Sequence, residues 1–297
     1  MKRLITTLLS IGLLTACAGI SAPGASKTET PKQALTAAGK AMAQLNSAKF
    51  DVNGTLNVTL PQPLADQLKA MGGSQAAVLS SNMTVSFKIT GAAQKPDRLQ
   101  ANLSATLGGL TIETEVIAMG GNLYYKDPTS GKWQMAKRAP ETTSPTAKAS
   151  APKLSYQAVV DTAKSVTEIT DSSSAINGAE HYRIVPDLAR LFAQVTAGHT
   201  SSSSATMTAL QTVLQNASLK ADAWTGTGDH LVRRLSYDAD VSADLHQLAA
   251  ALGNSATAMV PALNLPAGSI ARVTAHAVID LHDFNSKLTI KAPAVTS

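Results

Sequence analysis

The sequence predicts an α+β fold built around an antiparallel sheet of about ten or eleven strands. Three observations lead to this prediction. Apolar and polar residues alternate along several segments, as in strands with one buried and one solvated face. Turn-forming residues separate consecutive segments, which favours hairpins over parallel crossovers. Helical periodicity occurs in only a few clusters, too few for repeated strand–helix–strand units.

The first half of the domain is predicted to open with a helix that begins at Pro31, with Thr30 as its N-cap. Apolar residues then recur at helical spacing as far as Leu45, and after Ala48 the period changes to two. We expect a short helix at 64–71 and strands at 50–60, 83–90, 99–107, 110–116, 123–126 and 133–135.

A segment of Pro, Ser, Thr, Ala and Lys without any period, 139–153, is expected to be a flexible loop. A second helix is predicted from Leu154, so a helix followed by strands occurs twice, which suggests a faint internal duplication. Asn177-Gly178 is a hairpin signal. The remaining expectations are helices at 188–195, 207–217, 243–252 and 255–263, and strands at 166–171, 179–185, 218–225, 230–241, 270–282 and 287–292.

The amino end has the features of a lipoprotein signal. Lys2 and Arg3 precede a short apolar run, which is too short for a transmembrane helix. The run ends in Leu14-Thr15-Ala16-Cys17, which resembles the lipobox of bacterial lipoproteins, and Cys17 is the only cysteine. We therefore expect a signal peptide at 1–16, an acylated Cys17 with a flexible tether to residue 30, and a single domain at 31–297.

Composition excludes several classes of protein. With 44% hydrophobic residues and a small net charge, the chain does not have the composition of a disordered protein. One cysteine cannot make a disulfide scaffold. Loss of Lys2 and Arg3 with the signal peptide lowers the formal net charge from +5 to +3, and the basic residues are scattered. This distribution gives no sign of nucleic-acid binding.

The residues that usually carry chemistry are present but not grouped. His276, Asp280 and His282 share one strand face, but the two histidines are roughly 20 Å apart at the spacing of a strand. Glu113 and Glu115 belong to a solvated strand face, and no nucleophile elbow or phosphate-binding loop occurs. We therefore expect no metal, no cofactor and no enzymatic activity.

The apolar strand positions are unusual because they are mostly Ala, Val, Leu and Ile, with almost no aromatic residue. Small side chains on a strongly curved sheet can leave space for a ligand, although an ordinary packed core remains an alternative. Met-containing helices could form movable walls of such a space. The candidate lining residues for an apolar cavity are Leu56, Val58, Val85, Phe87, Leu103, Val116, Met207 and Leu210.

Several features together resemble the LppX/LprG-type lipoproteins of actinobacterial envelopes. They are the lipobox, the tether, the first helix running into a long alternating strand, the segment Leu123–Trp133, and the C-terminal segment Asp283–Pro293. This resemblance implies a half-open antiparallel barrel wrapped over helices, which enclose an apolar cavity for acyl chains. The long Ala/Ser/Thr-rich inserts near 61–80, 139–153 and 196–206 depart from the family pattern, so the resemblance does not extend to the form of the cavity entrance.

The leading functional expectation is a membrane-anchored lipoprotein that binds acylated lipids or glycolipids for transport or chaperoning across the cell envelope. Each buried CH₂ would contribute about 0.8 kcal/mol. An envelope transporter would be a fitting partner. The alternative is a structural or signalling lipoprotein that binds a protein or cell-wall partner through its polar sheet face. An anchored hydrolase is a third and weaker hypothesis.

Overall fold

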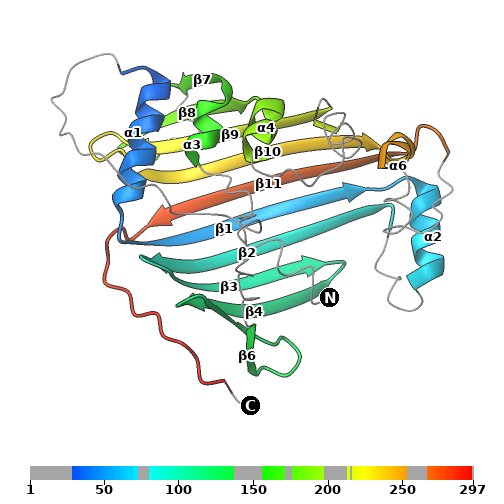
Figure 1. The fold of residues 1–297 in the computed structure, drawn as a ribbon, viewed down its shortest axis with the longest axis horizontal. Coiled ribbons are helices and arrows are strands. Elements are labelled where there is room, and N and C mark those ends of the chain that lie inside the picture. Colours follow the sequence, from blue (N-terminus) through cyan, green and yellow to red (C-terminus); the bar gives the residue numbers. More distant parts are fainter. Residues whose placement is uncertain are drawn as a thin grey trace, which may run out of the picture.

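The computed structural model describes residues 29–72, 80–136, 156–170, 176–196, 213–214, 216–252 and 266–295. These residues form one eleven-stranded sheet in the order β6-β5-β4-β3-β2-β1-β11-β10-β9-β8-β7 (Figure 1). All neighbouring strands run antiparallel. The strands are β1 (Ser47–Thr59), β2 (Asn82–Gln94), β3 (Arg98–Leu107), β4 (Leu110–Met119), β5 (Asn122–Lys126), β6 (Trp133–Ala136), β7 (Ala163–Ile169), β8 (Ala179–Pro186), β9 (Ala217–Gly226), β10 (Val232–Asp244) and β11 (Ile270–His282).

The sheet consists of two meanders that meet at its centre, where β1 pairs with β11. One meander runs from β1 to β6 and the other from β7 to β11. A helix precedes each of them, as the sequence pattern predicts. The helices are α1 (Pro31–Gln44), α2 (Gln62–Gly72), α3 (Tyr156–Asp161), α4 (Leu188–Thr196) and α6 (Leu245–Leu252).

Helix α1 begins as predicted, with Thr30 as its N-cap and Pro31 in its first turn. The Thr30 hydroxyl accepts a hydrogen bond from the backbone N–H of Gln33, and the Gln33 side chain accepts one from the backbone N–H of Thr30. This reciprocal capping satisfies two backbone donors that a helix start leaves free. The helix then places Leu35, which is fully buried, against the sheet.

Apolar and polar residues alternate along the strands, so the sheet has one apolar and one polar face. In the central register, Val52 lies opposite Ile89, which lies opposite Leu103, and all three take the apolar face. Helices α1, α3 and α4 pack on this face, which is turned toward the viewer in Figure 1. The core beneath them consists of Ala34, Leu35, Ala38, Phe50, Val52, Ala101, Ala158, Val159, Val160, Tyr182, Ile184, Leu191, Ala221, Ala223, Val232, Leu235, Ile279 and Leu281.

The expected α+β fold, with a half-open barrel of strands wrapped over helices and an enclosed apolar cavity, is wrong. The sheet stays open, because β6 at one end pairs with β5 and β7 at the other end pairs with β8. The described helices are short, and α1, α3 and α4 contact the sheet mainly at β7 to β10. The alternation of apolar and polar residues along a strand indicates which face of the sheet each side chain takes. Closure of a sheet into a barrel depends instead on the tilt and stagger of its strands, which no sequence pattern within one strand indicates.

Other expectations fall outside the described residues or fail. The helices expected at 207–217 and 255–263 lie mostly or wholly outside the described residues, as does the loop at 139–153. The strand expected at 287–292 is not formed, because this part of the chain has no regular structure. Ile290 within it is nevertheless buried, which explains the apolar alternation there.

Two glycines on the apolar face of central strands make room for phenylalanine rings. A Cβ atom at Gly91 would lie 2.6 Å from Cζ of Phe50 and 2.5 Å from the backbone oxygen of Gln100, and one at Gly54 would meet the ring of Phe87. Gly91→Val is therefore expected to overpack this contact and to lower the free energy of unfolding by about 3 kcal/mol or more, measured by chemical denaturation.

The matched control is Thr90→Val, one residue earlier on the polar face, which is expected to change stability by less than about 0.5 kcal/mol. Equal stability of the Gly91 variant and the control would show that the Phe50 ring does not depend on this glycine.

Candidate functional site

The apolar face continues beyond the area that the described helices contact. Leu56 lies opposite Val85 on β2 and Ala275 on β11, and Val58 lies opposite Met83 and Val273 in the next row. These side chains are half-buried. Five predicted lining residues share this face: Leu56, Val58, Val85, Phe87 and Leu103.

These half-buried residues belong to an apolar strip, which runs across the sheet from Leu56 on β1 and Val85 on β2 to Leu110 and Ile112 on β4. Leu110 and Ile112 take the same face and are 59% and 47% exposed. Strand β5 pairs with β4 at Val116–Met119, so Leu110 and Ile112 lie beyond the part of β4 that β5 covers. Exposed aliphatic side chains next to half-buried ones form a continuous apolar surface, which is typical of an interaction site.

The other predicted lining residues do not join this surface. Val116 takes the same face but is only 2% exposed, opposite Ala101 on β3 and Tyr125 on β5. It is a packed core residue. Met207 and Leu210 lie outside the described residues.

Three tyrosines that the sequence analysis did not single out lie where helices cover the apolar face. Tyr156 begins α3, Tyr182 is on β8 and Tyr237 is on β10, and all three pack in or against the core cluster. Burial raises the pKa of Tyr237 to about 12, and burial also raises the pKa values of Tyr156 and Tyr182. The three phenols are therefore protonated at neutral pH. The signal that could have found Tyr237 is its place among Leu235, Ala239 and Val241, where it interrupts an aliphatic run.

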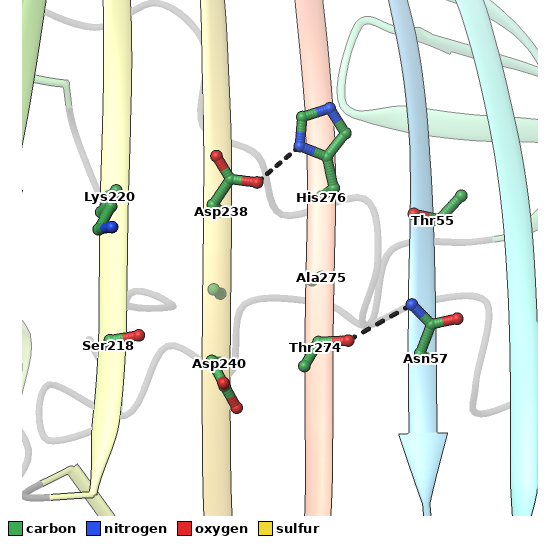
Figure 2. A pocket seen from close by; sticks show the side chains of 10 residues that line it. Thr55, Asn57, Ser218, Lys220, Asp238, Asp240, Thr274, Ala275 and His276 are labelled. Carbon is green, nitrogen blue, oxygen red and sulfur yellow. Dashed lines mark hydrogen bonds and ion pairs between the residues drawn. The ribbon is translucent and has the colours of Figure 1, made fainter.

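The polar face carries ion pairs between neighbouring strands, and Figure 2 shows the one between Asp238 and His276. Nδ1 of His276 lies 2.7 Å from Oδ1 of Asp238, and Nε of Arg272 lies 2.9 Å from Oδ1 of Asp240. The hydrogen bonds from Arg272 lower the pKa of the exposed Asp240 carboxyl. This pair therefore contributes stability at neutral pH, and its contribution is lost as the pH falls through the lowered pKa of Asp240.

Two shallow depressions lie on this polar face. The one in Figure 2 has a volume of about 290 Å³ and is lined by Thr55, Asn57, Ser218, Lys220, Asp238, Ala239, Asp240, Thr274, Ala275 and His276. The second, of about 250 Å³, lies beside Asp51 and His282, whose side chains are 3.1 Å apart. His276 and His282 thus pair with different aspartates, and neither pair includes Asp280, which binds Arg234.

Within the described residues, no group of three or more His, Cys, Asp or Glu side chains is placed to hold a metal ion. Nor does any described helix have the length and apolar character needed to cross a bilayer.

Comparisons with known proteins do not identify a family for this chain. No family model matches the sequence, and no curated protein matches it significantly. Among solved structures, a DUF1329 family protein from Desulfovibrio piger is 11% identical, with a TM-score of 0.21, over 88% of this chain and 96% of that chain. The enduracididine biosynthesis enzyme MppR with bound HEPES is 6% identical, with a TM-score of 0.14, over 79% of this chain and 85% of that chain. Likenesses at these TM-scores carry no argument about function.

Proposed function

We propose that this protein is a membrane-anchored lipoprotein that binds the acyl chains of lipids or glycolipids on the open apolar face of its sheet, and that it shields them during transport across the cell envelope. The observation that carries the proposal is the apolar strip from Leu56 and Val85 to Leu110 and Ile112, which extends past the described helices. Water-exposed aliphatic surface of this kind gains free energy when an apolar ligand covers it.

The dimensions of the strip suit acyl chains. The row Leu56, Val85, Leu107 and Leu110 crosses the four neighbouring strands β1 to β4, which corresponds to three strand spacings, about 14 Å. One leaflet of a bilayer has a hydrocarbon thickness of about 15 Å, which is close to the length of an acyl chain. An acyl chain can therefore lie along this row, across the four strands.

The anchor in this proposal is the acylated Cys17, at the end of the tether that precedes the sheet. Two or three acyl chains on one residue give durable membrane attachment. The sheet then lies outside the cytoplasmic membrane, where an envelope transporter could deliver or collect the lipid. The resemblance of the lipobox and closing segment to the LppX/LprG-type lipoproteins supports the same function.

The proposal predicts that a charge on the apolar face removes lipid. Leu56→Asp and Val85→Asp are expected to lower the amount of bound lipid at least about tenfold, because a carboxylate opposes the burial of apolar chains. The chain from residue 18 onward would be purified without detergent and extracted with organic solvent, and acyl lipids would be quantified by mass spectrometry.

Matched controls place the same charge on the opposite face of the same strands. Thr55→Asp and Ser86→Asp are neighbours of the two test positions and take the polar face. They are expected to retain lipid, and a melting curve for each variant separates loss of lipid from loss of fold. Extracts of the unmodified protein that hold no lipid would overturn the proposal.

A second candidate function rests on the polar face. The two depressions beside Asp238–His276 and Asp51–His282 offer hydrogen-bonding groups of both kinds to a protein or cell-wall partner. If the polar face is the functional surface, charge substitutions on it are expected to weaken binding of the protein or cell-wall partner and to leave the lipid content unchanged. This is the opposite of the result expected above.

A further inference from the structure

The outer edge of β4 is uncovered where the strand begins. Strand β5 pairs with β4 at Val116–Met119 only, and the four residues Leu110–Glu113 are all exposed. The Thr114 hydroxyl donates a hydrogen bond to the backbone oxygen of Lys126, so the chain that follows β5 borders the edge from Thr114 onward. Among the described residues, no strand pairs with the outer side of Leu110–Glu113, and we call these four residues the free edge.

The turn before β4 determines which backbone groups of the free edge face outward. Leu107 and Leu110 flank the two-residue turn Gly108-Gly109, in which both glycines have positive φ, as in a type I′ hairpin. The flanking residues of such a hairpin exchange hydrogen bonds, and alternate residues of an antiparallel strand bond to opposite neighbours. Leu110 therefore bonds to β3, whereas the N–H and C=O groups of Thr111 and Glu113 point away from β3. Another antiparallel strand can form hydrogen bonds with these groups.

The free edge lacks the features that protect sheet edges from pairing. Strand β7, at the opposite end of the sheet, has a register shift between Ala163 and Ser165, with Lys164 at the same point. Strand β6 is only four residues long. The free edge contains neither lysine nor proline, its pairing with β3 shows no register shift, and its Leu110 and Ile112 are 59% and 47% exposed. A regular, exposed and aliphatic edge of this kind favours pairing with another chain.

We infer that the free edge pairs with the free edge of a second copy of this chain, antiparallel and around a two-fold axis at Thr111. The two Thr111 residues then lie opposite each other and exchange two backbone hydrogen bonds. Leu110 of each copy lies opposite Ile112 of the other on the apolar face, which matches aliphatic with aliphatic side chains. Glu113 lies opposite Gly109, so no two like charges meet. The same residues serve both copies, as a closed two-fold contact requires.

The neighbouring registers fit less well. Outward-facing backbone groups must oppose one another, so the two-fold axis can move only by whole residues. An axis at Ile112 would place the second copy against the chain after Lys126, which borders Thr114. An axis at Glu113 would also place two carboxylates opposite each other, which is destabilising. An axis at Leu110 would match the outward-facing groups only with a turn glycine.

Pairing of the free edges joins the apolar strips of the two copies. A two-fold axis perpendicular to the sheet keeps the faces matched, so the row that crosses β1 to β4 as far as Leu110 continues through Ile112 of the second copy. The contact is small, so we expect reversible pairing, and two chains anchored in one membrane would meet at a raised effective concentration. This inference goes beyond the proposed function, because the pairing does not depend on whether lipid covers the strip.

Disulfide trapping tests the register. The chain from residue 18 onward lacks Cys17, so a single substitution supplies its only thiol. Leu110→Cys and Ile112→Cys proteins, mixed in equal amounts under mild oxidation, are expected to form a disulfide between the two variants, because directly opposite residues in this pair have Cα atoms about 4.5 Å apart. Each variant alone is expected to form no disulfide, because two copies of the same residue then lie on a diagonal, roughly 8 Å apart.

Two kinds of control accompany the trapping. Leu110→Cys mixed with Lys88→Cys measures random collision, because Lys88 is exposed on the polar face of a central strand. Thr111→Pro, added to both trapping variants, removes the N–H that bonds across the axis and is expected to slow formation of the mixed disulfide at least about tenfold. Thr111→Ala keeps this N–H and is expected to change the rate little, although both substitutions remove the hydroxyl that bonds to Thr106.

The outcomes separate this inference from the proposed function. A mixed disulfide that forms no faster than in the collision control, or that Thr111→Pro does not slow, would overturn pairing through the free edge. A disulfide formed by either variant alone would overturn the register. Extractable lipid, measured as above, tests the proposed function and is expected to be the same whether or not the free edges pair.

Discussion

Cys17→Ala is expected to abolish acylation of the protein and to release it from the membrane fraction. The physical reason is that Cys17 is the only thiol in the chain and the apolar run before it is too short to span a bilayer. In the proposed function, acyl chains on Cys17 hold the protein by burying about 0.8 kcal/mol per CH₂, and the Cys17→Ala protein would lack this contribution. Cells fed an alkyne-tagged palmitate would report acylation, and fractionation with a high-salt wash would report attachment.

Ser10→Ala serves as the control, because it alters the same N-terminal segment and leaves the cysteine intact. This variant should keep its label and stay with the membrane. If the Cys17 variant still carried label, the acylated residue would lie elsewhere, and if it pelleted through high salt without label, another part of the chain would provide the attachment.

The alternation of apolar and polar residues in the sequence predicted most of the described strands. The period-two pattern from Phe50 to Leu60 predicts β1, observed at Ser47–Thr59, and the pattern at 270–282 predicts β11 with the same bounds. The cap at Thr30 also followed from local chemistry, and Asn177-Gly178 forms a turn directly before β8, at the end of a longer connection from β7. These features succeed because each depends on neighbours in the sequence.

The features that failed depend on contacts between distant parts of the chain. The pair Asp238–His276 joins residues 38 apart in sequence, so it could be seen only once the register of β10 and β11 was known. Alternation placed Val116 on the apolar face, but its burial follows from Ala101 and Tyr125 beside it. Whether the sheet closes likewise depends on where its two end strands, β6 and β7, lie relative to each other. No sequence pattern within one strand predicts this.

Val116 and Leu103 are expected to respond in opposite ways when each is replaced by tryptophan. Val116 is fully packed, so Val116→Trp must displace its neighbours and is expected to lower the free energy of unfolding by about 3 kcal/mol or more. Leu103 is half-buried on the apolar strip, opposite Ile89 and Thr114, so a larger ring there can extend over the face. Leu103→Trp is therefore expected to keep most of the stability and to exclude acyl chains.

The two variants separate a lipid-binding face from a plain core because two quantities are measured on each: the melting temperature and the extractable lipid. Lys88→Ala and Glu113→Ala, exposed on the polar face, are controls that should change neither. Loss of lipid with a normal melting temperature in Leu103→Trp fits a ligand lying over β3. Loss of melting temperature in both tryptophan variants, in a protein that never carried lipid, would mean that the strip only packs against the protein itself.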